Sequence, residues 1–151
     1  MTSYLLDANV ILRASDPASS NYQLVVDSVF LLLNKNHECF LTPQVLIELW
    51  VVATRPLEVN GLGWTPEKTR QEINILTSQF VLLSDSPGIF TYWLDLVTTH
   101  NIKGKRTHDI RLLAVMKDAG IEYLLTFNPE DFVTISEVKI VTPQEIISGF
   151  Y

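Results

Sequence analysis

The opening run from Tyr4 to Leu12 constrains the fold of this chain more than any other stretch. Three apolar residues lead straight into Asp7, and a second apolar run that carries Asn9 follows. A short continuous apolar run of this kind is typical of a strand buried on both faces, as in a parallel sheet. Asp7 then falls at the carboxyl end of the strand, the edge where open α/β sheets bind their ligands. A buried carboxylate needs a partner, and we expect a metal ion.

Strand-like and helix-like segments alternate along the rest of the chain. Further strands are expected at His37–Leu41, Val81–Leu83, Ile121–Thr126 and Lys139–Val141. Helices are expected at 9–15, 22–36, 43–53, 65–80, 89–100, 108–119 and after Thr142. This alternation, without repeats or a low-complexity linker, predicts one α/β domain over residues 1–151. Its architecture should be a three-layer α/β/α sandwich with a mostly parallel central sheet.

Helix start signals support these boundaries. Thr42 and Thr65 each precede a proline, which favours a threonine N-cap with proline at the first helical position. Thr142 to Glu145 has the spacing of a capping box. Thr107 is expected to cap the helix that Gly120 ends.

Composition and charge narrow the class of protein. Hydrophobic residues make up 47% of the chain and charged residues 19%, as in a compact globule. Cys39 is a lone cysteine, expected to be a small buried hydrophobe, and no apolar run is long enough to span a bilayer. We therefore expect a cytoplasmic protein without membrane contact. A net charge of −6 counts against a nucleic-acid partner, unless divalent cations cancel some of the carboxylates.

Three carboxylates in apolar surroundings are the candidates for chemistry. Asp7 ends a strand, Glu48 lies within an apolar helix, and Asp109 lies in the first turn of another. Glu48 could instead pair with Arg55, and Asp109 could simply stabilise its helix terminus. Converging at one sheet edge, the three would suit Mg²⁺ or Mn²⁺, which prefer oxygen ligands.

Two further groups lie near this edge. In the polar turn after the strand at 121–126, Asn128 is a candidate metal ligand and Asp131 a supporting residue, although both could be ordinary turn formers. Lys103, Lys105 and Arg106 form a basic turn before Asp109. Beside a metal site, that turn is a candidate for phosphodiester contact. The chain has no cysteine cluster, P-loop, dinucleotide fingerprint or serine-hydrolase elbow.

Four segments in order resemble the PIN domain family of metal-dependent ribonucleases, which includes VapC-type toxins. These are the segment from Leu6 to Ile11, Glu48 in a helix that ends Ala-Thr-Arg-Pro, the pair His108-Asp109, and the turn from Thr126 to Phe132. The resemblance covers nearly the whole chain.

The resemblance implies functional roles for these residues. Asp7, Glu48 and Asp109 map onto the acidic catalytic and metal-binding site, and Asn9 onto a supporting polar residue. Many members have a fourth acid where this chain has Asn128, while Asp131 matches an acid three places later. The family further implies a Mg²⁺ or Mn²⁺ cofactor, an RNA substrate, a homodimer and an antitoxin protein.

Two alternatives remain at the level of the sequence. A haloacid-dehalogenase-type phosphatase would use Asp7 as a nucleophile, but it needs a second aspartate where this chain has Asn9. A PIN-fold binding domain with weak or no catalysis is favoured by Asn128 and by the acidic balance. For partners, the segment Leu57–Trp64, with Val51, Val52 and Leu62, could expose an apolar patch or simply pack into the core.

Overall fold

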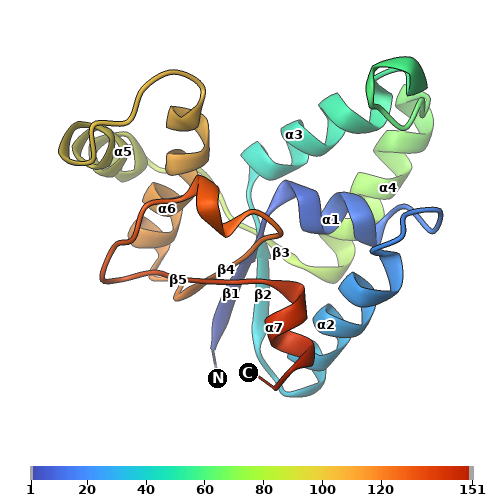
Figure 1. Cartoon of the computed structure of the whole chain (residues 1–151), viewed down its shortest axis with the longest axis horizontal. Coiled ribbons are helices and arrows are strands. Elements are labelled where there is room, and N and C mark those ends of the chain that lie inside the picture. The colour runs from blue at the N-terminus through green and yellow to red at the C-terminus, as the bar shows by residue number, and fades with distance from the viewer. Residues whose placement is uncertain (1, 150–151) are drawn as a thin grey trace.

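A five-stranded parallel sheet forms the centre of the computed structural model, which describes residues 2–149 (Figure 1). The strands are β1 (Ser3–Leu6), β2 (Glu38–Leu41), β3 (Val81–Leu82), β4 (Tyr123–Leu125) and β5 (Lys139–Val141), in the order β3-β2-β1-β4-β5. Every neighbouring pair is parallel. The predicted α/β fold is confirmed, and its sheet is wholly rather than mostly parallel.

Helices cover both faces of the sheet (Figure 1). They are α1 (Ala8–Ala14), α2 (Tyr22–Asn34), α3 (Pro43–Thr54), α4 (Pro66–Gln79), α5 (Pro87–Thr99), α6 (Arg106–Ala119) and α7 (Pro143–Ile147), with 3-10 turns η1 (Leu57–Val59) and η2 (Pro129–Asp131). Helix α5 packs against α6, whereas α2 packs against α1 and α7. Helix α3 contacts both α1 and α4.

Strand β1 is central because its apolar side chains are buried from both sides. Tyr4 pairs with Cys39 of β2 and with Tyr123 of β4, and Leu5 lies between Phe40 and Leu124. Tyr4, Leu5 and Leu6 are at most 1% exposed. The first half of the opening run, Tyr4 to Leu6, is therefore the buried strand that its sequence predicts, and the second half begins α1.

The helix start signals are confirmed in all but one case. The Thr42 hydroxyl accepts a hydrogen bond from the Val45 amide (3.2 Å), and Thr142 and Glu145 form the expected capping box. The prediction that Thr107 caps a helix was wrong, because α6 already begins at Arg106. The Thr107 hydroxyl instead donates to the carbonyl oxygen of Gly104 (2.8 Å), so it closes the turn before the helix.

The order of the strands locates the ligand-binding edge. From β1 the chain moves outward to β2 and β3, and it then returns to the other side of β1 to form β4. The sheet therefore has a topological switch point between β1 and β4, where α/β sheets bind ligands. Asp7 lies there, and its amide donates to the carbonyl oxygen of Leu125 at the end of β4 (3.0 Å).

Cys39 is buried in β2, and burial raises the pKa of its thiol to about 12. It is therefore the small buried hydrophobe that the sequence indicates. Within residues 2–149, no helix combines the length and the apolar character needed to cross a bilayer.

Candidate metal centre

A cavity of about 460 Å³ opens at the carboxyl edge of β1 and β4. Its polar lining comes from α1, α3, α6 and the turn after β4, together with Asp7 at the end of β1: Asp7, Asn9, Arg13, Glu48, Arg55, Asp109, Asn128 and Asp131. All the acids and amides expected from the sequence therefore face one space. The arginines among its lining were not expected there.

Asp7 is the most buried acid of the cavity, with 7% of its surface exposed. It is the N-cap of α1, where its Oδ1 accepts from the Ala8 amide (2.7 Å) and its Oδ2 accepts from the Thr126 hydroxyl (2.8 Å). Burial nevertheless raises the pKa of this carboxyl, and repulsion from Asp109 and Asp131 adds to the effect. The hydrogen bonds therefore only partly offset the cost of a charge here, and a nearby cation would offset more.

Thr126 and Asn9 fix the position of Asp7. The side-chain nitrogen of Asn9 donates to Thr126 Oγ1 (3.3 Å) and lies 3.5 Å from Asp7 Oδ2, while Asn9 Oδ1 accepts from the Phe127 amide (3.2 Å). Thr126 Oγ1 also accepts from the Asn128 amide (3.1 Å). Thr126 was not predicted from the sequence to be a site residue. The signal for it was its place as the first polar residue after a buried strand.

Glu48 is half-buried on α3, and its contacts come from polar neighbours rather than from a cation. Gln44 donates to Glu48 Oε1 (3.1 Å) and to the carbonyl oxygen of His108 (2.6 Å), which ties α3 to α6. Burial raises the pKa of Glu48, and Asp7 and Asp109 raise it further. Among residues 2–149, the pairing of Glu48 with Arg55 that the sequence left open does not form.

Asp109 lies in the first turn of α6, half-buried, and Asp131 lies in η2. Burial and the Asp131 carboxylate raise the pKa of Asp109, while Arg106, His108 and Lys105 oppose that shift. Because Asp131 acts on both Asp7 and Asp109, it adds a fourth negative charge to the cavity. Asn128 lines the cavity as an exposed neutral side chain.

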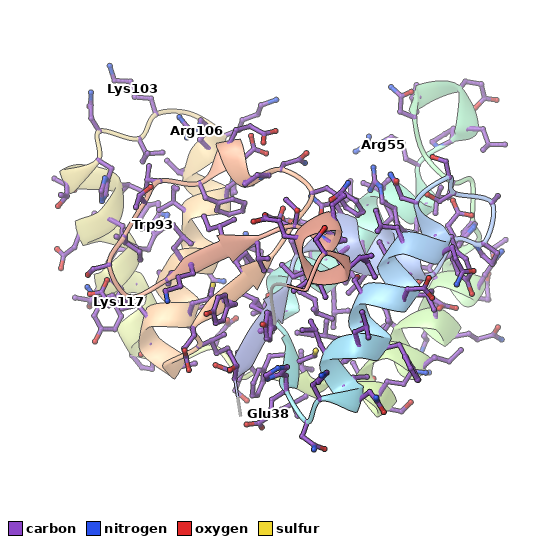
Figure 2. The ribbon with its side chains drawn as sticks, turned by 60° about the horizontal axis from the view of Figure 1, so that its bottom comes forward. Glu38, Arg55, Trp93, Lys103, Arg106 and Lys117 are labelled. Atoms are coloured by element: carbon purple, nitrogen blue, oxygen red, sulfur yellow. The ribbon has the colours of Figure 1, made fainter. Side chains whose placement is uncertain are left out.

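The basic turn lies beside the cavity rather than in its wall. Arg106 donates to the carbonyl oxygen of Asp131 (3.4 Å), and both Lys105 and Arg106 act on the pKa of Asp109. Figure 2 shows Arg106 and Lys103 at the end of the molecule opposite Glu38, where β2 begins, with Lys103 farther out.

The donor set fits a hard divalent ion that is bound partly through water. No group of three or more His, Cys, Asp or Glu side chains forms a ready-made metal cage within the described residues 2–149. Mg²⁺ does not require such a cage, because it usually keeps several waters and binds through one or two carboxylates. Apart from the arginines, the polar side chains that line the cavity are carboxylates and amides. Burial disfavours the charged forms of Asp7, Glu48 and Asp109, which a bound cation would stabilise.

The raised pKa values predict how stability depends on pH. A carboxyl whose pKa is higher in the folded than in the unfolded protein destabilises the fold at high pH, and this cost disappears as the pH falls through the folded pKa. We therefore expect Asp109→Asn to be more stable than the wild type in EDTA at pH 7.5, by less than about 1 kcal/mol because Asp109 is half exposed. The difference should shrink as the pH falls toward 3.8, the ordinary pKa of an aspartate side chain. Urea unfolding at several pH values measures this, and a constant difference would contradict it.

Comparisons with known proteins identify the family and the fold of the chain. Residues 4–138 match the family model of the PIN domain. No curated protein sequence is significantly similar to the chain. Among solved structures, VapBC2 from Rickettsia felis, bound to a DNA fragment from its promoter, is 20% identical with a TM-score of 0.68, and the match covers 93% of this chain and 98% of that one.

Two more solved structures share the fold. VapBC-1 from nontypeable Haemophilus influenzae is 18% identical with a TM-score of 0.68, and the match covers 95% of this chain and 99% of that one. VapC20 from Mycobacterium tuberculosis, a Sarcin-Ricin loop cleaving toxin, is 14% identical with a TM-score of 0.65, over 87% and 98% of the two chains. At these identities the likeness is one of fold. Because the family model spans most of the chain, the protein belongs to the PIN domain family.

Proposed function

We propose that this PIN domain is a Mg²⁺- or Mn²⁺-dependent endoribonuclease and the toxin of a VapBC-type pair. The observation that carries the proposal is the cavity in which Asp7, Glu48 and Asp109 converge, all with raised pKa values. The fold shared with VapBC proteins and with a Sarcin-Ricin loop cleaving toxin supports it.

Each residue of the cavity has a role in this proposal. Asp7, Glu48 and Asp109 would hold the cation with Asn128 as a further oxygen donor, and Asp131 would add negative charge. A bound Mg²⁺ or Mn²⁺ would lower the pKa of a water and neutralise charge that develops on the phosphate. Asn9 and Thr126 hold the Asp7 carboxylate in place through the hydrogen bonds described above.

The phosphatase alternative finds little support in the surroundings of Asn9. A haloacid-dehalogenase-type enzyme needs a titratable acid at that position, and an amide has no such proton. The amide of Asn9 is engaged with Thr126 and Phe127, where it joins α1 to the end of β4. In the binding-domain alternative, the protein has the same fold but does not cleave RNA.

The test compares two substrates in the presence and absence of metal. The wild type should cleave labelled single-stranded RNA with Mn²⁺ or Mg²⁺, not in EDTA, and should leave para-nitrophenyl phosphate intact. Turnover of the phosphomonoester alone would favour the phosphatase. RNA left intact by a protein that melts at a higher temperature with Mn²⁺ would favour the binding domain.

The proposed toxin is a homodimer that also binds an antitoxin. Two large apolar side chains are exposed beside His108 and Arg111: Phe90 of α5 (63%) and Ile47 of α3 (64%). Each lines a separate cavity, and His108 and Arg111 line both of these cavities. Exposed apolar side chains so close together are typical of an interface. In the segment Leu57–Trp64, where the sequence left an exposed patch and core packing open, Trp64 and Leu62 pack against the core, whereas Leu57 and Val59 are exposed.

Phe90→Glu should convert the dimer to a monomer in light scattering. Phe30→Glu is the matched control, because Phe30 is equally exposed (64%) but lies on α2. A wild type that stays monomeric at high concentration would contradict the dimer.

For the antitoxin, a small protein encoded beside this gene should co-purify with the chain and suppress its cleavage of RNA; an unaffected rate would contradict that pairing.

A further inference from the structure

Two arginines lie in the wall of the acidic cavity. Arg13 and Arg55 are both half-buried, and both line the cavity that holds the acids. Within residues 2–149, the ion pairs are Arg111 with Asp85 (3.3 Å) and Lys117 with Glu137 (3.7 Å). Neither arginine of the cavity therefore neutralises a carboxylate directly, and their charges remain available to another anion.

Arg13 is held by the same segments that position Asp7. Its Nη1 donates to the carbonyl oxygen of Asn9 (3.1 Å), and its Cζ lies 5.2 Å from the centroid of the Phe127 ring. The amide of Phe127 in turn donates to the side chain of Asn9. These contacts use one donor and one face of the guanidinium and leave its other N–H groups free to bind a ligand.

Arg55 is held at the end of α3 through its backbone. The chain turns back after η1, so that the Gly63 amide donates to the carbonyl oxygen of Arg55 (2.9 Å). A Cβ at Gly61 would collide with that carbonyl group, which explains the glycine there. Arg55 is the C-cap residue of α3 and follows Glu48 by seven residues, about 10 Å along the helix axis, and both line the cavity. Figure 2 shows Arg55 at the same end of the molecule as Arg106.

We propose that Arg13 and Arg55 clamp the phosphate backbone of RNA beside the metal centre. The inference rests on the proposed ribonuclease function. A chain of net charge −6 with four acids in one cavity repels RNA unless cations meet the phosphates. The planar guanidinium fork fits phosphate oxygens well and stays charged. The acids would thus serve the divalent ion, and the arginines would bind the phosphates that flank the cleaved bond.

The experiment uses Arg13→Ala and Arg55→Ala, with Arg70→Ala as the matched control. Arg70 is exposed on α4, outside the lining of the cavity, so the control removes the same charge elsewhere. Each cavity variant should raise KM for fluorescein-labelled single-stranded RNA by about 10- to 100-fold, with little change in kcat. Each should also lower the slope of log KM against log salt concentration by about one. The control should do neither.

A second measurement separates this inference from the proposed function. The melting temperature with and without Mn²⁺ should respond equally in the wild type and in both arginine variants, because the arginines do not hold the ion. Arg13→Lys, which keeps the charge but loses the fork, should have an intermediate KM and guards against misfolding of Arg13→Ala. An unchanged KM and salt slope in an active, metal-responsive protein would overturn the clamp alone. A wild type without metal response or cleavage would overturn the function and the clamp with it.

Discussion

Asp7→Asn should lower metal-dependent RNA cleavage by at least about 100-fold, because even residues that only support a metal ligand typically cost 10- to 100-fold when they are replaced. The same substitution should remove most of the stabilisation by Mn²⁺. For an intact site, metal at about 100 times its Kd should add about 2.7 kcal/mol. In a domain of this size, that corresponds to a rise of roughly 5–10 °C in Tm.

The fold should survive this substitution. Asn is as good an N-cap as Asp, so α1 keeps the hydrogen bond that Asp7 now accepts from Ala8. An asparagine presents an amide nitrogen where Asp7 Oδ2 accepts from the Thr126 hydroxyl, but removal of a charge whose pKa is raised by burial offsets this loss, so the protein should still fold in EDTA. Loss of activity would then reflect lost metal binding rather than unfolding.

The measurement pairs an RNA cleavage assay with thermal melting in EDTA and in Mn²⁺. Asp95→Asn is the control, since Asp95 is exposed on α5 and lies outside the acidic cavity. The control should match the wild type in both assays. Full metal-dependent cleavage by Asp7→Asn would remove Asp7 from the mechanism.

Thr126→Val is expected to damage both stability and activity. The side chain is fully buried, and its hydroxyl donates to Asp7 while it accepts from Asn9 and from the Asn128 amide. Valine has nearly the same shape but leaves these groups without that partner, at a cost of about 1–3 kcal/mol. Because Thr126 fixes a proposed metal ligand, metal affinity or cleavage should fall by about 10- to 100-fold.

Two comparisons isolate the role of this hydroxyl. Thr126→Ser keeps it and should retain most of the metal response. Thr69→Val removes another buried hydroxyl, which lies on α4 and donates to the carbonyl oxygen of Thr65, the N-cap of that helix, so it should affect stability without affecting the metal response. Equal metal responses in Thr126→Val and Thr69→Val would show that the Thr126 hydroxyl does not support the site. Urea unfolding and titration with Mn²⁺ provide the two readouts.

The sheet and the acids could be predicted because their signals are local. Continuous apolar runs identify buried strands, and threonine followed by proline identifies helix starts at Thr42, Thr65 and Thr142. Since carboxyl ends of parallel strands meet at one edge, Asp7 and the turn that carries Asn128 could be placed together. Glu48 and Asp109 could be singled out because one is an acid within an apolar helix and the other lies in the first turn of a helix.

The remaining features depend on contacts between distant segments. Thr126 looks like any threonine after a strand until its hydroxyl is seen to join Asp7, Asn9 and Asn128. Arg13 lies in the last turn of α1, where a basic residue ordinarily serves the helix dipole. Thr107 was wrongly predicted to be an N-cap because a threonine hydroxyl can either cap a helix or close a turn, and the sequence does not distinguish the two.

The placement of β1 between β2 and β4 has a consequence for synthesis of the protein. Asp7 is synthesised long before two of the groups that hold it, the Leu125 carbonyl and the Thr126 hydroxyl, which belong to the segment at the end of β4. We expect a growing polypeptide to lack nuclease competence until that segment has left the ribosome and docked beside β1.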